Sequence, residues 1–162
     1  MLPNGSEKAE NNETERMVDK FVIDASVALK WQFKDEFETE AAMGMLSDFM
    51  NDKTELLSPA LFAYEIVNAL TIAVVRKRLP EKEGADAIND ILSLGIKLID
   101  FSGFEKVTFS LAQAYKRSAY DCAYLSLAEK EDSTLYTGDK RLFNALKEKT
   151  GRIKWIGNYT HA

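Results

Sequence analysis

Short apolar runs alternate along the chain with longer segments in which apolar residues recur at helical spacing. Residues 21–23 (FVI) form one such run and predict a buried strand. The next segment carries an apolar residue at every fourth position, which is the period of a helix. The repeat that predicts this helix consists of Phe37, Ala41, Met45 and Phe49.

The same alternation continues to the end of the chain. A weaker strand at 55–57 is followed by Ser58 and Pro59, which can serve as the N-cap and first residue of a helix extending to about Arg78. Pro80 opens another helix that ends at Gly95. The remaining predictions are a strand at 96–99, helices at 104–117 and 119–131, a strand at 134–137, a helix from 140 to about 149 and a strand at 153–156.

Alternating strands and helices of this kind imply crossover connections between parallel strands. The pattern predicts an α/β fold, a three-layer sandwich with a mainly parallel central sheet of about five strands and helices on both faces. A chain of 162 residues suits a single domain, which we assign to residues 17–162. Residues 1–16 have almost no apolar content, and we expect them to form a flexible acidic N-terminal extension.

The chain holds a single cysteine, Cys122, and a single histidine, His161. One cysteine excludes an internal disulfide and any multi-cysteine metal site, so a reducing compartment, the cytoplasm, is the simpler expectation. A lone histidine near the end of the chain argues against Ser-His-Asp catalysis and two-histidine metal sites. No apolar run approaches the roughly 20 residues of a membrane span. Catalysis would have to use carboxylates, hydroxyls, amines or metal-bound water.

A formal net charge of −5 argues at first against a polyanionic partner, because phosphates are bound mainly by Lys and Arg. The charge is unevenly distributed, however. Residues 1–50 carry 5 basic and 11 acidic side chains, whereas residues 137–156 carry 6 basic and 2 acidic ones. The basic segment includes Lys140 and Arg141, and it permits a phosphate-bearing partner, although a solvated helix face explains the same charges.

Two carboxylates follow predicted strands. Asp24 comes directly after the strand at 21–23, and Asp139 comes two residues after the strand that ends at Thr137. Open parallel sheets bind ligands at the carboxyl ends of their strands, so both side chains are expected at the same edge of the sheet. Each of them can equally cap the helix that follows it.

Two further carboxylates are predicted to lie on helices. Glu65 interrupts a strongly apolar segment, where an isolated charge is costly to bury, and Asn68 shares its helix face. Asp121 lies in the first turn of a helix, where the helix dipole favours an anion. Ser118 and Asp121 also match the form of a capping box with Asp in place of Glu. Capping and a groove-facing position therefore stay open as alternatives for these acids.

If the four acids converge, their mutual repulsion raises their pKa values unless a cation compensates. Ligands that are all oxygen favour Mg²⁺ or Mn²⁺ over zinc. Such an ion accepts phosphate oxygens and lowers the pKa of a bound water, which suits phosphoester hydrolysis without a histidine base. The sequence has no GxxxxGK[ST], GxGxxG or HExxH motif, which weakens NTPase, dinucleotide-binding and metalloprotease hypotheses.

The four acids belong to segments that are familiar together: FVIDASVALKW at 21–31, YEIVNAL at 64–70, YDCAYLSLAE at 120–129 and TGDKRL at 137–142. In content and order they resemble PIN-domain proteins of the VapC toxin type, and the resemblance covers about residues 18–157. Four segments in the family's order are a much more specific signal than any one of them alone.

The resemblance implies an Mg²⁺- or Mn²⁺-dependent ribonuclease with a parallel-sheet sandwich. It also implies a homodimer and a cognate antitoxin whose C-terminal segment lies in a groove near the active site. Ser26 and Thr137 match the family's hydroxyl residues beside the first and last acids. The acidic quartet falls on Asp24, Glu65, Asp121 and Asp139.

The leading hypothesis is a metal-dependent endoribonuclease. Glu65 either ligates the ion or orients the attacking water. The expected metal ligands are Asp24, Asp121 and Asp139; the supporting residues are Ser26, Asn68 and Thr137; and the expected RNA contacts are Lys140 and Arg141.

Two alternatives remain open. A phosphohydrolase of small phosphoesters would use Asp24 as its nucleophile, but such chemistry usually needs a second acid two residues later, and Ser26 stands there. A non-catalytic module would only hold RNA or a partner helix, and it would bind without metal and without turnover.

Overall fold

A computed structural model describes residues 17–161 of the chain, so the extension expected over 1–16 lies outside the described residues. The chain forms one five-stranded sheet in which every paired neighbour is parallel. The strands are β1 (Asp19–Ile23), β2 (Thr54–Pro59), β3 (Lys97–Ile99), β4 (Thr134–Thr137) and β5 (Ile153–Trp155). Their order in the sheet is β3-β2-β1-β4-β5. The predicted α/β fold with a parallel sheet is confirmed.

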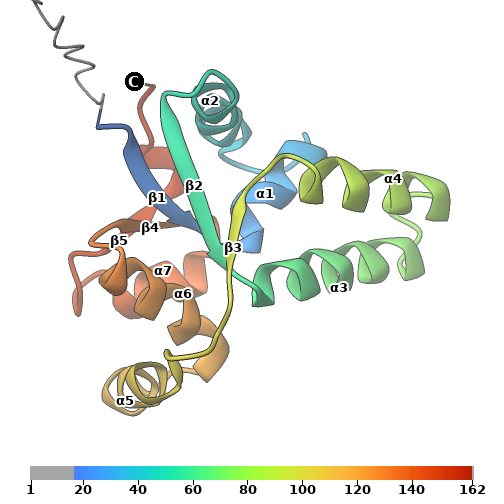
Figure 1. The fold of residues 1–162 in the computed structure, drawn as a ribbon. Coiled ribbons are helices and arrows are strands. Elements are labelled where there is room, and N and C mark those ends of the chain that lie inside the picture. Colours follow the sequence, from blue (N-terminus) through green and yellow to red (C-terminus); the bar gives the residue numbers. More distant parts are fainter. Residues whose placement is uncertain (1–16, 162) are drawn as a thin grey trace, which may run out of the picture.

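Helices connect the strands and cover the two faces of the sheet (Figure 1). Right-handed crossovers place the helices between β1 and β3 on one face and the helices between β3 and β5 on the other. The first group is α1 (Ala25–Gln32), α2 (Thr39–Met50), α3 (Leu61–Val75) and α4 (Glu81–Leu92). The second group is α5 (Glu105–Tyr115), α6 (Ala119–Lys130) and α7 (Lys140–Leu146), followed by the short 3₁₀ helix η1 (Ile156–Asn158).

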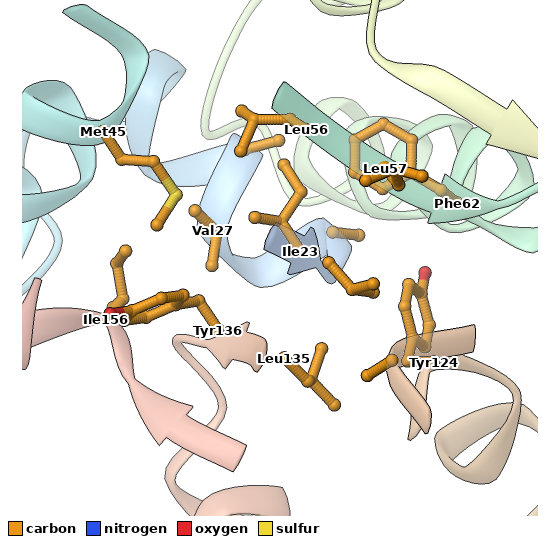
Figure 2. Packing of buried hydrophobic residues seen from close by; sticks show 14 of the residues in the cluster. Ile23, Val27, Met45, Leu56, Leu57, Phe62, Tyr124, Leu135, Tyr136 and Ile156 are labelled. Atoms are coloured by element: carbon orange, nitrogen blue, oxygen red, sulfur yellow. The ribbon is translucent and has the colours of Figure 1, made fainter. Parts of the chain in front are cut away.

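The hydrophobic core lies around the central strand β1. Val22 and Ile23 point to opposite faces of the sheet, and both are fully buried because helices cover both faces. Figure 2 shows Ile23 among side chains from β2, β4, α1, α2 and α6. Full burial of such a side chain contributes about 1.5–3 kcal/mol to folding. The packing of Ile23 therefore fixes the position of the residue after it, Asp24.

Two features near the N-terminus differ from the sequence prediction. Phe37, the first residue of the four-residue repeat, lies in the loop before α2 and is 81% exposed. Glu38 has left-handed backbone geometry with φ 63°, which a right-handed helix cannot continue, so the helix begins only at Thr39. The sequence analysis did not predict helix α1. This helix is short, and a lysine, Lys30, lies among its buried apolar residues, so its sequence shows no clear division into apolar and polar faces.

Ser58 and Pro59 end strand β2 and do not open the next helix, so that prediction was wrong. Both residues pair with β3, where Ser58 is in register with Leu98. The Ser58 hydroxyl donates a hydrogen bond to the Ile23 carbonyl oxygen at 2.5 Å, and it is therefore not available to cap α3. Within residues 17–161 the structure has no helix long and apolar enough to cross a membrane.

Candidate active site

Asp24 and Asp139 lie at the carboxyl ends of adjacent strands. Strands β1 and β4 are parallel neighbours, with Ile23 in register with Tyr136, so Asp24 emerges beside Thr137. The Asp24 amide donates to the Tyr136 carbonyl oxygen at 3.4 Å, which extends this pairing by one residue. The sheet therefore brings the first and last acids to one edge, the position expected from their place after the strands.

Two hydroxyl groups hold the carboxylate of Asp24. Ser26 Oγ donates to Oδ1, and Thr137 Oγ1 donates to Oδ2. Asp24 is only 6% exposed and makes no side-chain cap bond to α1, although it occupies the N-cap position. The capping interpretation is therefore wrong for Asp24. Both of its oxygens are oriented by side chains that belong to different segments of the chain.

Asp139, by contrast, does cap a helix. Its Oδ1 atom accepts bonds from the amides of Arg141 at 2.9 Å and Leu142 at 3.2 Å, the first turn of α7. Its Oδ2 atom takes no part in the cap and lies 3.8 Å from Arg141 Nη2. The backbone amide of Asp139 donates to Thr137 Oγ1 at 3.0 Å. The helix cap thus holds Oδ1 of Asp139, and Oδ2 lies near the exposed guanidinium of Arg141.

Glu65 extends from α3 and is half-buried. Its Oε2 atom accepts a hydrogen bond from the hydroxyl of Tyr124, a buried residue of α6. The sequence analysis did not find Tyr124, although it lies one helical turn after Asp121 and so could have been placed near the same site. Asn68 is exposed one turn further along α3.

Asp121 begins α6 and forms half of the predicted capping box. Its amide donates to Ser118 Oγ at 3.1 Å. Its carboxylate instead accepts a bond from Arg117 Nη2 at 2.8 Å, and both side chains are about one-fifth exposed. The sequence analysis missed Arg117, and its spacing of four residues from Asp121 was the available signal. The Nε atom of Arg117 is buried and has no hydrogen-bond partner among the described residues.

The four carboxylates act on one another electrostatically. Burial raises the pKa of Asp24 to about 6, against the opposing effect of its two hydroxyl partners, and the charges of Glu65 and Asp139 raise it further. Burial also raises the pKa of Glu65, with contributions from Asp121 and Asp139, while the Tyr124 hydrogen bond lowers it. Each acid of the predicted quartet thus takes part in these electrostatic interactions.

The residues of this site fit a hard divalent cation in their donor chemistry. All four groups are carboxylates, and their mutual repulsion is the condition that a bound cation relieves. Within residues 17–161, however, no three acidic, histidine or cysteine side chains are grouped closely enough to hold one ion. Arg117, Arg141 and Tyr124 bind three of the four acids at present. Asp121 and Asp139 would have to turn from their arginine partners to share an ion.

The basic residues of α7 lie beside this site. Lys140 and Arg141 directly follow Asp139, and both are exposed. The Nζ atom of Lys140 lies 5.9 Å from the centre of the Phe37 ring and 6.0 Å from that of Trp155. The sequence predicted the positive charges of Lys140 and Arg141, but not the aromatic rings near Lys140.

The model of the PIN domain family matches residues 21–149, a range that includes all four acids. The chain belongs to the PIN domain family. The resemblance inferred from the four sequence segments is thereby confirmed.

Relatives of known name agree with this membership. Ribonuclease VapC3 from Pyrobaculum aerophilum is 29% identical over 125 residues, which cover 76% of this chain and 92% of that protein. Ribonuclease VapC12 from Mycobacterium tuberculosis is 27% identical over 121 residues, which cover 75% of this chain and 88% of that protein. The crystal structure of PAE2754 from Pyrobaculum aerophilum has the same fold, with a TM-score of 0.63 at 21% identity over 86% of this chain and 92% of that one.

Proposed function

We propose that this PIN-domain protein is a metal-dependent endoribonuclease that hydrolyses RNA phosphodiester bonds, and that it is the toxin of a toxin–antitoxin pair. The observation that carries the proposal is that carboxylates from four separate elements lie near this sheet edge, where burial and neighbouring acidic charges raise the pKa values of Asp24 and Glu65. The names of the relatives, both ribonucleases, support the choice of RNA as substrate.

In this proposal Asp24, Asp121 and Asp139 hold Mg²⁺ or Mn²⁺, and Glu65 either ligates the ion or orients the attacking water. When bound, the ion supplies a water of lowered pKa and neutralises charge on the phosphate. Asp24 contributes a carboxylate whose direction is set before any ligand arrives, because hydroxyl groups hold both of its oxygens. Asp139 contributes Oδ2, since Oδ1 is occupied by the α7 cap.

Tyr124 orients Glu65. Burial and the neighbouring Glu65 charge raise the pKa of Tyr124, so the phenol keeps its proton and acts only as a hydrogen-bond donor. One oxygen of Glu65 is engaged by Tyr124, and burial together with the charges of Asp121 and Asp139 raises the pKa of Glu65. The other oxygen can accept a proton from an attacking water, a role for which a raised pKa is favourable.

The phosphohydrolase alternative gains no support from the geometry. The residue two positions after Asp24 is Ser26, and its hydroxyl donates to Asp24 itself. An acid that protonates the leaving group is needed there for catalysis by an aspartyl nucleophile, and serine is a poor substitute. The non-catalytic alternative makes a clear contrary prediction, which is binding without metal and without turnover.

The test compares the protein with Asp24→Asn on a mixed pool of structured and single-stranded RNA, with Mn²⁺, with Mg²⁺ and with EDTA. A matched control is Asp19→Asn, since Asp19 is an exposed aspartate at the opposite end of the same strand. Cleavage by the protein and by Asp19→Asn, lost in Asp24→Asn and in EDTA, is the expected result. Equal cleavage by Asp24→Asn would contradict the proposal.

The proposed function also includes a second subunit and a protein partner. We expect a homodimer and a cognate antitoxin, on the resemblance to the toxin family, and a location in the cytoplasm. Size-exclusion chromatography with light scattering measures the first, and suppression of RNA cleavage by the product of a neighbouring small gene tests the second. A monomer, or a nuclease that no neighbouring gene product inhibits, would contradict these two expectations while leaving the chemistry untouched.

A further inference from the structure

Phe37 is a large aromatic residue that the fold leaves in solvent. It lies in the loop between α1 and α2 and is 81% exposed. Single exposed apolar residues are common on protein surfaces and mean little alone. The contacts of the loop that carries Phe37 are what distinguish it.

Two basic side chains from outside the loop contact the segment that carries Phe37. Lys30 of α1, only 5% exposed, donates from Nζ to the Phe37 carbonyl oxygen at 2.8 Å and lies 3.6 Å from Glu36 Oε2. Arg78, after α3, donates to Glu36 Oε1 at 3.3 Å and to Asp35 Oδ1 at 2.9 Å. The loop therefore presents the Phe37 ring on a backbone that is already ordered, which lowers the entropy cost of binding a ligand.

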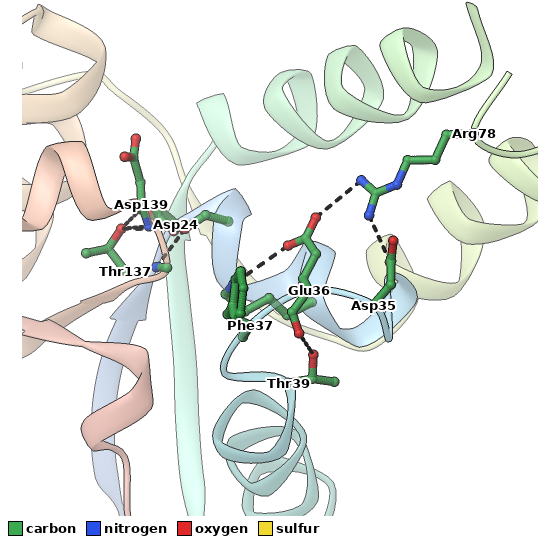
Figure 3. Close-up of polar contacts among 11 residues, drawn as sticks. Asp24, Asp35, Glu36, Phe37, Thr39, Arg78, Thr137 and Asp139 are labelled. Carbon is green, nitrogen blue, oxygen red and sulfur yellow. Dashed lines mark hydrogen bonds and ion pairs between the residues drawn. The ribbon is translucent and has the colours of Figure 1, made fainter. Parts of the chain in front are cut away.

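The same lysine connects Phe37 to the active site. A Cβ atom on Gly138 would lie 2.5 Å from Lys30 Cε, so the lysine passes directly against the backbone between Thr137 and Asp139. The Gly138 amide also donates to Ser26 Oγ at 2.7 Å. Figure 3 shows Phe37 between the group of Asp24, Thr137 and Asp139 and the pair of Glu36 and Arg78. Phe37 thus borders the site of the proposed chemistry.

A positive charge accompanies the ring. Lys140, the residue after Asp139, places Nζ 5.9 Å from the centre of the Phe37 ring. Arg141 adds a second exposed cation in the same helical turn. Proteins bind single-stranded nucleic acid by combining cations, which follow the phosphates, with aromatic rings on which bases stack. Phe37 and Lys140 provide one of each beside the acidic quartet.

The other exposed aromatic residues near the site lie in a different setting. Tyr64 and Tyr120, each next to a quartet acid, line a hollow of about 320 Å³ together with Phe101. The residues that line this hollow include no Lys or Arg. The lining of this hollow therefore lacks the charge that a phosphate backbone needs, whereas Lys140 and Arg141 lie on the Phe37 side.

We infer that Phe37 is a stacking platform for an unpaired base of the RNA next to the scissile phosphate, with Lys140 contacting the adjoining phosphate. This inference rests on the proposed ribonuclease function and adds to it a contact for an unpaired base beside the acidic site. A base inside a duplex is stacked on its neighbours and cannot lie on the ring.

The test measures binding of a fluorescein-labelled RNA of roughly 12 nucleotides, single-stranded or in a duplex of the same sequence, by anisotropy in EDTA so that no metal-dependent cleavage occurs. Phe37→Ala should bind the single strand about ten-fold more weakly than the protein, which corresponds to the loss of one base–aromatic stack. Phe37→Trp should bind within about two-fold of the protein, because indole stacks equally well. The protein and both variants should bind the duplex with the same affinity.

Phe109→Ala is the matched control, since Phe109 is a 64% exposed phenylalanine on α5, on the face opposite the loop. It should bind both RNAs as the protein does. Unchanged single-strand binding by Phe37→Ala would overturn the inference and leave Phe37 as a contact for a protein partner. Equal loss of single-strand and duplex binding would overturn it too, as would no single-strand binding by the protein itself.

The inference and the proposed function fail in different ways. Cleavage of the RNA pool with no effect of Phe37→Ala on binding would preserve the nuclease and remove the platform. Selective loss of single-strand binding in Phe37→Ala, without cleavage under any metal condition, would preserve the platform and remove the nuclease.

Discussion

Asp24 and Asp139 leave the ends of two hydrogen-bonded strands, whereas Glu65 and Asp121 extend from two helices that pack around the sheet. Both oxygens of Asp24 accept bonds from hydroxyl groups, and Asp139 is fixed by the amides of α7. The helix acids instead depend on one side chain each, a tyrosine for Glu65 and an arginine for Asp121. In the strand half, each acid is thus held by two groups, hydroxyls for Asp24 and backbone amides for Asp139, whereas each acid of the helix half is held by a single side chain.

The two halves also differ in the electrostatic cost of their charges. Asp24 is buried, so its charge is costly and its pKa rises. Asp121 is paired with Arg117, so its charge is compensated by the protein itself. A metal ion would therefore relieve an existing strain at Asp24, but it would have to compete with an existing partner at Asp121. The two halves should respond differently to substitution, to pH and to metal.

The largest expected effect is on RNA cleavage by Asp24→Asn. This substitution removes a carboxylate in which hydroxyl groups already orient both oxygens. We expect cleavage to fall by about 1,000-fold, as when a preorganised electrostatic contact is lost from an active site. Initial rates with Mn²⁺ measure it, with Asp19→Asn as the control. A loss of less than about ten-fold would show that the strand half does not dominate.

Stability in EDTA should fall as the pH rises from about 4 to 6. The folded-state pKa of Asp24 is raised from 3.8 to about 6, so the folded state holds the proton over a range in which the unfolded state has lost it. The stabilising contribution is complete below the unfolded pKa and is lost as the pH rises through the folded one, about 3 kcal/mol for this shift.

Urea denaturation of the protein and of Asp24→Asn at several pH values between 4 and 7 tests this expectation. The difference in unfolding free energy between the two proteins should change with pH in favour of the variant. Parallel pH profiles for the two proteins would show that Asp24 does not carry the burial cost.

Glu65→Gln should reduce cleavage by about 100-fold, less than Asp24→Asn, because Gln keeps an oxygen that accepts the Tyr124 hydrogen bond and loses only the charge. The expected range is that of a group that orients a water or acts as a base. Single-turnover cleavage rates measure the loss, and an unchanged melting temperature serves as the folding control. A loss equal to that of Asp24→Asn would remove the distinction between the two halves.

The smallest expected effect concerns Arg117. Replacing it with Gln removes the cation that pairs with Asp121, and we expect Mn²⁺ to bind about three-fold more tightly, because a partly exposed charge pair is screened by water. Isothermal titration calorimetry measures the affinity. Arg152→Gln is the control, since Arg152 pairs with Asp132 at a distance from the quartet. Weaker Mn²⁺ binding in Arg117→Gln would mean that the arginine supports Asp121 rather than competing for it.

Much of the strand half could be predicted from the sequence. The strand at 134–137 was predicted with the bounds that the structure shows, and the placement of Asp24 and Asp139 at one edge followed from the rule for parallel strands. These predictions succeed because hydrophobic periodicity and strand direction are local properties of the chain. Ser58 and Pro59 mark the limit of such reasoning, because their pairing with β3 overrode a good helix-start signal.

The sequence by itself determined the fold class, the family and the four acids, since each depends on local pattern or on segments that carry their own signal. Only the tertiary structure decided which side chains hold those acids and that Phe37 stands in solvent beside them. Tyr124 reaches Glu65 across 59 residues of sequence, and Lys30 of α1 donates to the carbonyl oxygen of Phe37 in the loop that follows α1. Such contacts arise from the packing of whole elements against one another, which no local pattern of residues encodes.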